Sequence, residues 1–190
     1  ADSLAPTLFY TWWARLRDSI WQDQLWEGKR TILPQRSRTL ALVKNVSQKT
    51  PGPFDAFWLD DRTTEKKEDL SFLVNRAFHQ AWKKLEHQLG KVNHWQWRRV
   101  NSTQLPHIAK ISPFNSDLIN MGGSLNTPNA NKGTHGAVWK MVVELGDPFE
   151  AWTNIAGGVS GSPTDRSYQQ FVENWSQGKL RKANYWLQPQ

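Results

Sequence analysis

The chain has 190 residues, a formal net charge of +7, 12 tryptophans and no cysteine. This length and a hydrophobic content of 38% are sufficient for a folded domain with its own core, and they exclude an intrinsically disordered chain. The lack of cysteine excludes disulfides, thiolate metal sites and a cysteine nucleophile, and no apolar stretch has the length of a membrane span.

The positive charge is spread over the whole chain. Basic residues occur as separated pairs interleaved with acids, and the densest group, residues 179–182, contains three charges. Segments that bind nucleic acid usually carry longer basic blocks. The pairs are Lys29–Arg30, Lys66–Lys67, Lys83–Lys84 and Arg98–Arg99. The pattern therefore predicts a solvated surface and no specific nucleic-acid partner.

Two helices are predicted in the first half of the chain. Over residues 6–26 the apolar residues recur at helical spacing, and Ser3 is available as an N-cap. Thr64 offers a second cap, and an apolar pattern of three- and one-residue steps runs over residues 70–89 until Gly90 ends it. Both helices are expected to face a core.

Strands are predicted in the second half. Residues 95–97 and 105–108 favour two short strands, and residues 137–145 and 149–156 favour a hairpin around the turn at 146–148. In the first hairpin strand every odd position is apolar, which predicts one fully buried face packed against a helix layer. Trp139 and Met141 would lie on this face, and a last helix from Tyr168 to Trp175 would end at Gly178.

Glycine-rich loops precede and follow this hairpin. Together with the strand between them they resemble the closing segment of the penicillin acylase family, the N-terminal-nucleophile amidohydrolases. The family pattern is a glycine loop with a later Thr-x-Asn, a His-Gly-x-x-Trp strand and a Gly-Gly-x-Ser-Gly turn. Lys140, Val159 and Ser162 depart from the family's Arg, Gln and Asn. The matching residues, for which we predict structural roles, are Gly122, Gly123, Thr127, Asn129, His135, Gly136, Trp139, Gly157, Gly158, Ser160 and Gly161.

The resemblance implies a fold as well. Family members form an αββα sandwich, to which this chain would contribute strands of one sheet and helices of the outer layers. By itself the chain would then be α+β and would be the C-terminal segment of a longer β chain. We expect one segment over residues 1–190, with helices mostly over 1–100, the glycine loop and strand pair over 101–163, and a terminal helix and tail over 164–190.

No catalytic residue is assigned to this chain. The family's nucleophile is a Ser whose own α-amine is the general base, and it is followed by Asn and shortly afterwards by Trp. No such run occurs here, and Ser3 is followed by a Leu-Ala-Pro sequence that fits a helix cap. The five histidines lack zinc-site spacing, so no metal or cofactor is assigned; calcium ligands of the family lie in preceding parts. His135 is a weak substrate-binding candidate, and a structural role is favoured for it.

The function that the resemblance implies belongs to a longer parent protein. The parent would hydrolyse linear amides through an acyl-enzyme intermediate, with acyl amides, β-lactam side chains and N-acyl homoserine lactones as candidate substrates. Its location would be periplasmic or secreted. The chain itself would be an inactive scaffold whose partner is the rest of the same precursor, namely the α chain and the N-terminal part of the β chain. In isolation it is expected to dimerise through open strand edges.

An interpretation of a different class is a stand-alone binding module. Exposed tryptophans and basic residues could stack on carbohydrate or single-stranded nucleic acid. This requires Trp95, Trp97 and Trp139 to lie exposed in a row, whereas burial against helices would remove its basis.

Overall fold

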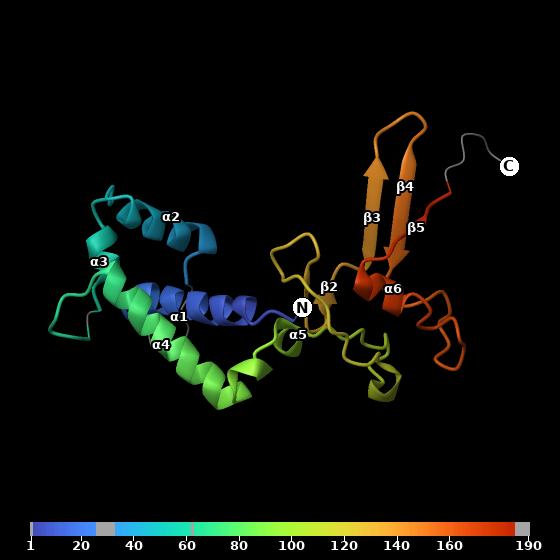
Figure 1. Ribbon diagram of the computed structural model, residues 1–190, viewed down its shortest axis with the longest axis horizontal. Coiled ribbons are helices and arrows are strands. Elements are labelled where there is room, and N and C mark those ends of the chain that lie inside the picture. Colours follow the sequence, from blue (N-terminus) through green and yellow to red (C-terminus); the bar gives the residue numbers. More distant parts are fainter. Residues whose placement is uncertain (1, 26–32, 62, 185–190) are drawn as a thin grey trace. The chain divides into compact units, whose positions relative to one another are not determined.

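The computed structural model describes residues 2–25, 33–61 and 63–184. The chain divides into two compact units, which we call the helical unit (Ser3–Trp95) and the sheet unit (Gln96–Gln190 together with Ala1–Asp2) (Figure 1). Helices and small antiparallel sheets are both present, so the fold class is α+β as predicted. Within the described residues, no helix is long and apolar enough to cross a bilayer.

The helical unit is built on two long helices that pack along each other, α1 (Ala5–Leu25) and α4 (Leu70–Leu89) (Figure 1). The helices α2 (Arg36–Ser47) and α3 (Asp55–Leu59) add to the same core, and a short 3-10 turn, η1 (Val92–His94), follows α4. The buried core residues are Leu16, Ile20, Trp21, Leu42, Leu59, Leu73 and Ala77. A core made from all four helices explains why this unit is compact by itself.

Both predicted helices are confirmed, with one cap corrected. Ser3 Oγ accepts a hydrogen bond of 3.2 Å from the backbone N–H of Ala5, as a cap at the start of α1 should. The predicted cap Thr64 is wrong, because α4 begins at Leu70 and the Asp69 carboxylate accepts the bond from Phe72 N–H. The carboxylate has the same capping chemistry and lies at the residue where the helix starts.

Helix α2 was not predicted from the sequence. It is attached partly by a polar contact, in which Trp21 Nε1 donates a 2.9 Å hydrogen bond to the buried Thr39 Oγ1. Leu42 adds a buried apolar contact to the core. A pattern of apolar residues does not include a buried threonine, so the core-facing side of α2 is not evident from the sequence.

The two short strands predicted before the glycine loop are wrong. Trp95 follows η1 and is fully buried. Its Nε1 donates to Gly90 O at 3.0 Å, and its ring contacts the ring of Trp82 edge-on. Trp97 begins a one-turn helix, α5 (Trp97–Val100). Residues 105–108 form no strand, since Leu105 N–H is taken by the side chain of Ser116. Side-chain partners that satisfy the backbone replace a ladder here.

The sheet unit contains the predicted hairpin. Strands β3 (Trp139–Glu144) and β4 (Glu150–Ile155) are antiparallel, with Trp139 opposite Ile155 and Glu144 opposite Glu150. The short strand β5 (Arg181–Lys182) adds to β4, which gives the order β3-β4-β5 (Figure 1). The other elements are the 3-10 turn η2 (Ser112–Phe114), the two-residue strands β1 (Asn131–Lys132) and β2 (His135–Gly136), and the helix α6 (Val172–Gln177).

The predicted left-handed cap at the end of α6 is also confirmed. Gly178 has φ 71° and ψ 17°, and its N–H bonds back to the last turn of the helix. The helix itself is shorter than predicted, because it begins at Val172 and not at Tyr168. A positive φ of this kind is strongly favoured by glycine.

The prediction that β3 has a fully buried face is wrong for the described residues. The side chains of Trp139 and Met141 are 59% and 52% exposed, and neither packs beneath a helix layer. Helix α6 lies on the opposite face, where Lys140 contacts the buried Trp175. The alternation along the strand was interpreted correctly, but nothing in the described chain covers its odd-numbered face.

Candidate functional site

The first glycine loop is held by a buried asparagine network. Asn101 and Asn131 are both almost completely buried. Asn101 Nδ2 donates to Asn131 Oδ1 at 2.7 Å and to Gly123 O at 3.0 Å. Asn131 Nδ2 donates to Gly122 O at 2.5 Å and to Asn129 O at 2.9 Å. These bonds connect α5, the glycine loop and β1, so the loop has one defined path in the sheet unit.

The glycine at position 123 is required by this geometry. Its φ is +93°, and a Cβ atom there would lie 2.1 Å from Asn129 O and 2.8 Å from Asn131 Nδ2. Gly123 O also accepts a 2.7 Å bond from Trp97 Nε1. A side chain at this position would therefore break the contact between the loop and the network.

The remaining loop residues of the family pattern act on the backbone. Thr127 Oγ1 accepts from Ser124 N–H at 2.9 Å, which closes a tight turn. Asn129 Nδ2 donates to Gly122 O at 2.9 Å, while its Oδ1 is buried without a hydrogen-bond partner among the described residues. The loop from Gly122 to Asn131 is therefore held by hydrogen bonds between its own residues.

The second glycine loop is a closed turn. Gly157 has φ +93°, and a Cβ on Gly158 would lie 1.8 Å from Ser167 O. Ser167 O accepts from Val159 N–H at 3.1 Å. The hydroxyl of Ser160 accepts from Ser162 N–H at 3.2 Å, so it serves the turn. By contrast, Gly161 has open space where a side chain would be.

The structure brings some of the predicted residues together and leaves others apart. Gly122, Gly123, Thr127 and Asn129 converge around Asn131, as described. His135 lies at the surface in β2, and its ring makes no hydrogen bond within the described residues. A Cβ atom on the neighbouring Gly136 would lie 3.4 Å from Ala130 O. Trp139 lies exposed on β3. The role of His135 in a substrate cleft stays a prediction.

Asn101 and Asn131 were missed at the sequence level. Both residues are polar, they lie thirty positions apart, and a lone asparagine in a loop sequence usually indicates a turn. The proximity of Asn131 to the Thr-x-Asn pattern is the one signal that could have identified it. For Asn101 the linear sequence offers none.

Lys140 occupies an unusual position on the even-numbered face of β3. Its Nζ donates to Trp175 O at 2.8 Å and lies 4.7 Å from the centroid of the Trp175 ring. Burial lowers the pKa of the Lys140 ammonium below its ordinary value, because desolvation disfavours the charged form. Trp175 in turn donates from Nε1 to Ala137 O at 2.9 Å. The lysine thus fastens α6 to the sheet through a carbonyl bond and a cation–π contact.

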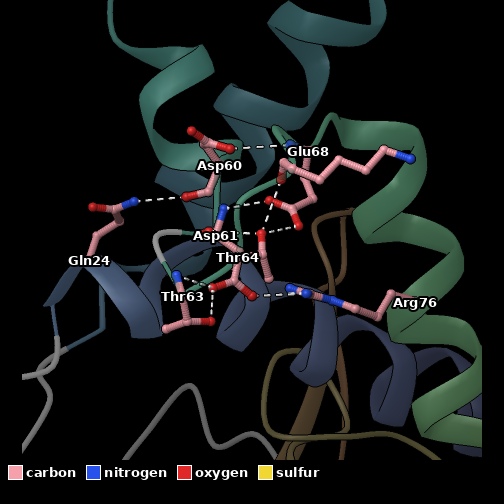
Figure 2. Close-up of polar contacts among 8 residues, drawn as sticks. Gln24, Asp60, Asp61, Thr63, Thr64, Glu68 and Arg76 are labelled. Atoms are coloured by element: carbon pink, nitrogen blue, oxygen red, sulfur yellow. Dashed lines mark hydrogen bonds and ion pairs between the residues drawn. The ribbon is translucent and has the colours of Figure 1, made fainter.

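The helical unit contains a second polar cluster, the acidic knot, formed by Asp61, Thr63, Thr64, Glu68 and Arg76 (Figure 2). Glu68 is buried and accepts from Thr64 Oγ1 at 2.6 Å and from Asp61 N–H at 2.9 Å. Asp61 accepts from Thr63 Oγ1 at 2.6 Å and pairs with Arg76 at 2.9 Å. The donors to Glu68 both lie in the loop before α4, whereas Asp61 is held by Thr63 of that loop and by Arg76 of α4.

These donors act on the acidity of the two carboxyl groups. The hydrogen bond from Thr63 lowers the pKa of Asp61 most, with Arg76 contributing further. The bond from Thr64 lowers the pKa of Glu68 most. Donors that favour the ionised carboxylate have this effect. Both groups are therefore structural anions that hold the loop before α4.

Among the described residues, no group of three His, Cys, Asp or Glu side chains is placed to hold a metal ion. The hydroxyl of Ser3 is occupied as a helix cap. The hydrogen bonds and close approaches described above fix the two glycine loops and the sheet between them.

The family model described as penicillin amidase matches residues 1–188. No curated protein matches the chain significantly. The match covers both units and includes both glycine loops.

Proposed function

The chain belongs to the penicillin amidase family, and from this we propose that it is a scaffold segment of an amidohydrolase that cleaves linear amides. The nucleophile is then a serine supplied by another part of the same precursor. Its free α-amine acts as the general base, and the reaction passes through an acyl-enzyme intermediate.

The observation that carries this proposal is the open apolar face of β3. Trp139, Met141 and Val143 share one face of β3, and all three are exposed, as is Leu145 directly after the strand. A soluble protein rarely leaves such a continuous apolar patch uncovered. We propose that the remaining part of the precursor covers it. The asparagine network supports a scaffold role, because its polar groups are directed at the loop backbone.

The proposed architecture is one side of an αββα sandwich. The sheet β3-β4-β5 has a helix, α6, on its even-numbered face. A second sheet from the rest of the precursor would pack on the odd-numbered face, at about 10 Å as in other face-to-face sheets. Trp139 and Met141 would then be buried in the interior between the two sheets.

The remaining parts of the proposal concern the whole parent protein. Its substrate is a small-molecule amide, with acyl amides, β-lactam side chains and N-acyl homoserine lactones as candidates, and its location is periplasmic or secreted. Any calcium belongs to the preceding parts of the precursor. Specific binding to nucleic acid is not part of the proposed function, because the basic pairs are dispersed.

The binding-module interpretation has less support. Trp95 is fully buried against α4, and Trp97 is half-buried with its Nε1 bonded to Gly123 O. Trp139 alone of the three is well exposed. The exposed row of tryptophans that this interpretation requires is therefore absent from these three positions.

The proposal is tested by assaying a chromogenic acyl amide with the 190-residue chain alone and with the chain joined to the rest of its precursor. We expect no turnover by the chain alone and turnover by the processed precursor. Turnover by the chain alone that disappears in Ser3→Ala would place the nucleophile here and overturn the proposal.

A matched pair of variants tests the role of the β3 face in the same assay. Trp139→Asp places a charge on the face to be covered, and Val159→Asp places one in an exposed turn. We expect the first to abolish assembly and activity of the precursor and the second to leave both unchanged. Equal effects of the two substitutions would contradict the proposed cover.

A further inference from the structure

The outer edge of β3 is a second unpaired surface of the sheet unit, distinct from its faces. In the sheet order β3-β4-β5, β3 has a strand on one side, and no other described strand pairs with it. Val138 O accepts from Ala156 N–H at 2.7 Å, so Val138 and the even-numbered residues of β3 bond to β4. Because backbone groups alternate along a strand, those of Trp139, Met141 and Val143 point to the open edge.

The side chains along this edge are self-complementary. In an antiparallel pair of two β3 strands, the open-edge groups can bond when odd-numbered residues lie opposite odd-numbered residues. One such register places Met141 opposite the partner's Val143 and Val142 opposite the partner's Val142. In that register Lys140, whose Nζ also donates to Trp175 O within its own chain, lies opposite the partner's Glu144. This charge pair occurs twice because the arrangement has two-fold symmetry.

The two nearest alternative registers are less favourable. With Met141 opposite the partner's Met141, the ammonium of Lys140 would lie opposite the partner's Val142. With Val143 opposite the partner's Val143, the carboxylate of Glu144 would lie opposite the partner's Val142. Opposite charges that face each other across strands stabilise a sheet, whereas a charge facing an apolar side chain forgoes this gain. Lys140 and Glu144 therefore select one register out of these three.

We propose that the 190-residue chain forms a two-fold symmetric dimer in which β3 pairs antiparallel with β3 of a second copy, with Lys140 opposite the partner's Glu144. The sheet would continue across the two copies. Pairing of this kind removes the exposed backbone groups of an edge strand, and the apolar residues on both faces of β3 gain neighbours. The inference does not depend on the amidohydrolase proposal; a strand from the rest of the precursor would compete for the same edge.

Single cysteines test the register directly, because the chain has no cysteine of its own. Val142 and Met141 are 55% and 52% exposed, which makes them a matched pair. In the proposed register the two Val142 residues form a non-hydrogen-bonded pair with Cα atoms about 4.5 Å apart, within the range of a disulfide. We expect Val142→Cys to form a disulfide-linked dimer under mild oxidation, and Met141→Cys to form one at least about tenfold more slowly.

A charge reversal tests the same proposal without a disulfide. Glu144→Lys places like charges opposite each other twice, which should raise the dimer dissociation constant about tenfold. Glu86→Lys makes the same change on the exposed surface of α4 and should have no effect. The measurement is light scattering during size exclusion, with a wild-type mass twice the 22.0 kDa of one chain expected. A wild-type monomer, or equal cross-linking of the two cysteine variants, would overturn the proposal.

Discussion

Asn101 and Asn131 are thirty residues apart and meet through a buried hydrogen bond of 2.7 Å from Nδ2 to Oδ1. Through this contact one side chain of the pair reaches Gly123 O and the other reaches Gly122 O. The geometry of the first glycine loop thus depends on Asn131 at the end of the loop and on Asn101, which lies outside it in sequence. The same pair gives the most direct test of the loop's structure.

Asn131→Ala should destabilise the sheet unit by about 2–3 kcal/mol, because it leaves the buried Nδ2 of Asn101 and two loop carbonyls with fewer partners. Asn126→Ala is the matched control, since Asn126 is exposed in the same loop, and it should change stability by less than about 0.5 kcal/mol. Urea unfolding followed by tryptophan fluorescence measures both. Equal midpoints for the two variants would show that the network does not stabilise the loop.

The two glycines of the second loop should differ sharply in their tolerance of a methyl group. Gly158→Ala should cost about 3 kcal/mol or more, because its Cβ would lie 1.8 Å from the backbone oxygen of Ser167. Gly161→Ala places its Cβ in open space and should be nearly neutral. Thermal unfolding of the two variants makes the comparison, and a loss of stability in Gly161→Ala as large as in Gly158→Ala would contradict the proposed close approach.

The tryptophans of the sheet unit should be very unequal in their contribution to stability. Trp175 is 1% exposed, so Trp175→Ala should cost about 3–5 kcal/mol. Trp139 is 59% exposed, so Trp139→Ala in the chain alone should cost only about 1 kcal/mol. Denaturant unfolding of the two variants is the measurement. A large cost at Trp139 in the Glu144→Lys background, in which the proposed dimer is weakened, would mean that its face is covered within the chain itself.

The acidic knot should make the helical unit sensitive to acid. The pKa values of Asp61 and Glu68 are lowered from ordinary values of 3.8 and 4.5, so their ionised forms stabilise the folded state. This stability is present above the ordinary values and is lost as the pH falls from there through the lowered values. Helical circular dichroism during thermal unfolding between about pH 7 and pH 3 measures the loss.

Two isosteric variants assign this loss to the knot. Asp61→Asn removes one of the titrating groups and should flatten the pH dependence, at the cost of lower stability at neutral pH. Glu65→Gln is the control, because Glu65 is exposed outside the knot. If Glu65→Gln flattened the acid profile as much as Asp61→Asn, the carboxylates of the knot would not be its source.

Several features could be read from the sequence because they depend on local chemistry. The long helices α1 and α4 follow from apolar residues at helical spacing, and the hairpin follows from period-two alternation around a Gly-Asp-Pro turn. The left-handed cap at Gly178 follows from the positive φ that glycine adopts readily. Local pattern was therefore sufficient wherever a residue's role depends on its own backbone or its near neighbours.

Other features depended on contacts between residues of different elements. The burial of Trp95 was decided by Trp82 and the carbonyl of Gly90, and the position of α2 was decided by Trp21 and Leu42. None of these contacts has a periodic signature, because their partners belong to different elements.

The sequence by itself determined the family, through two glycine loops and the strand between them, and it determined which residues of β3 share a face. Only the tertiary structure decided that the odd-numbered face of β3 is open and that Asn101 and Asn131 hold the first loop. Alternation states that two sets of side chains point in opposite directions, but burial requires a second surface to pack against them. Whether that surface exists is a property of the whole folded chain and its partners, which no local pattern encodes.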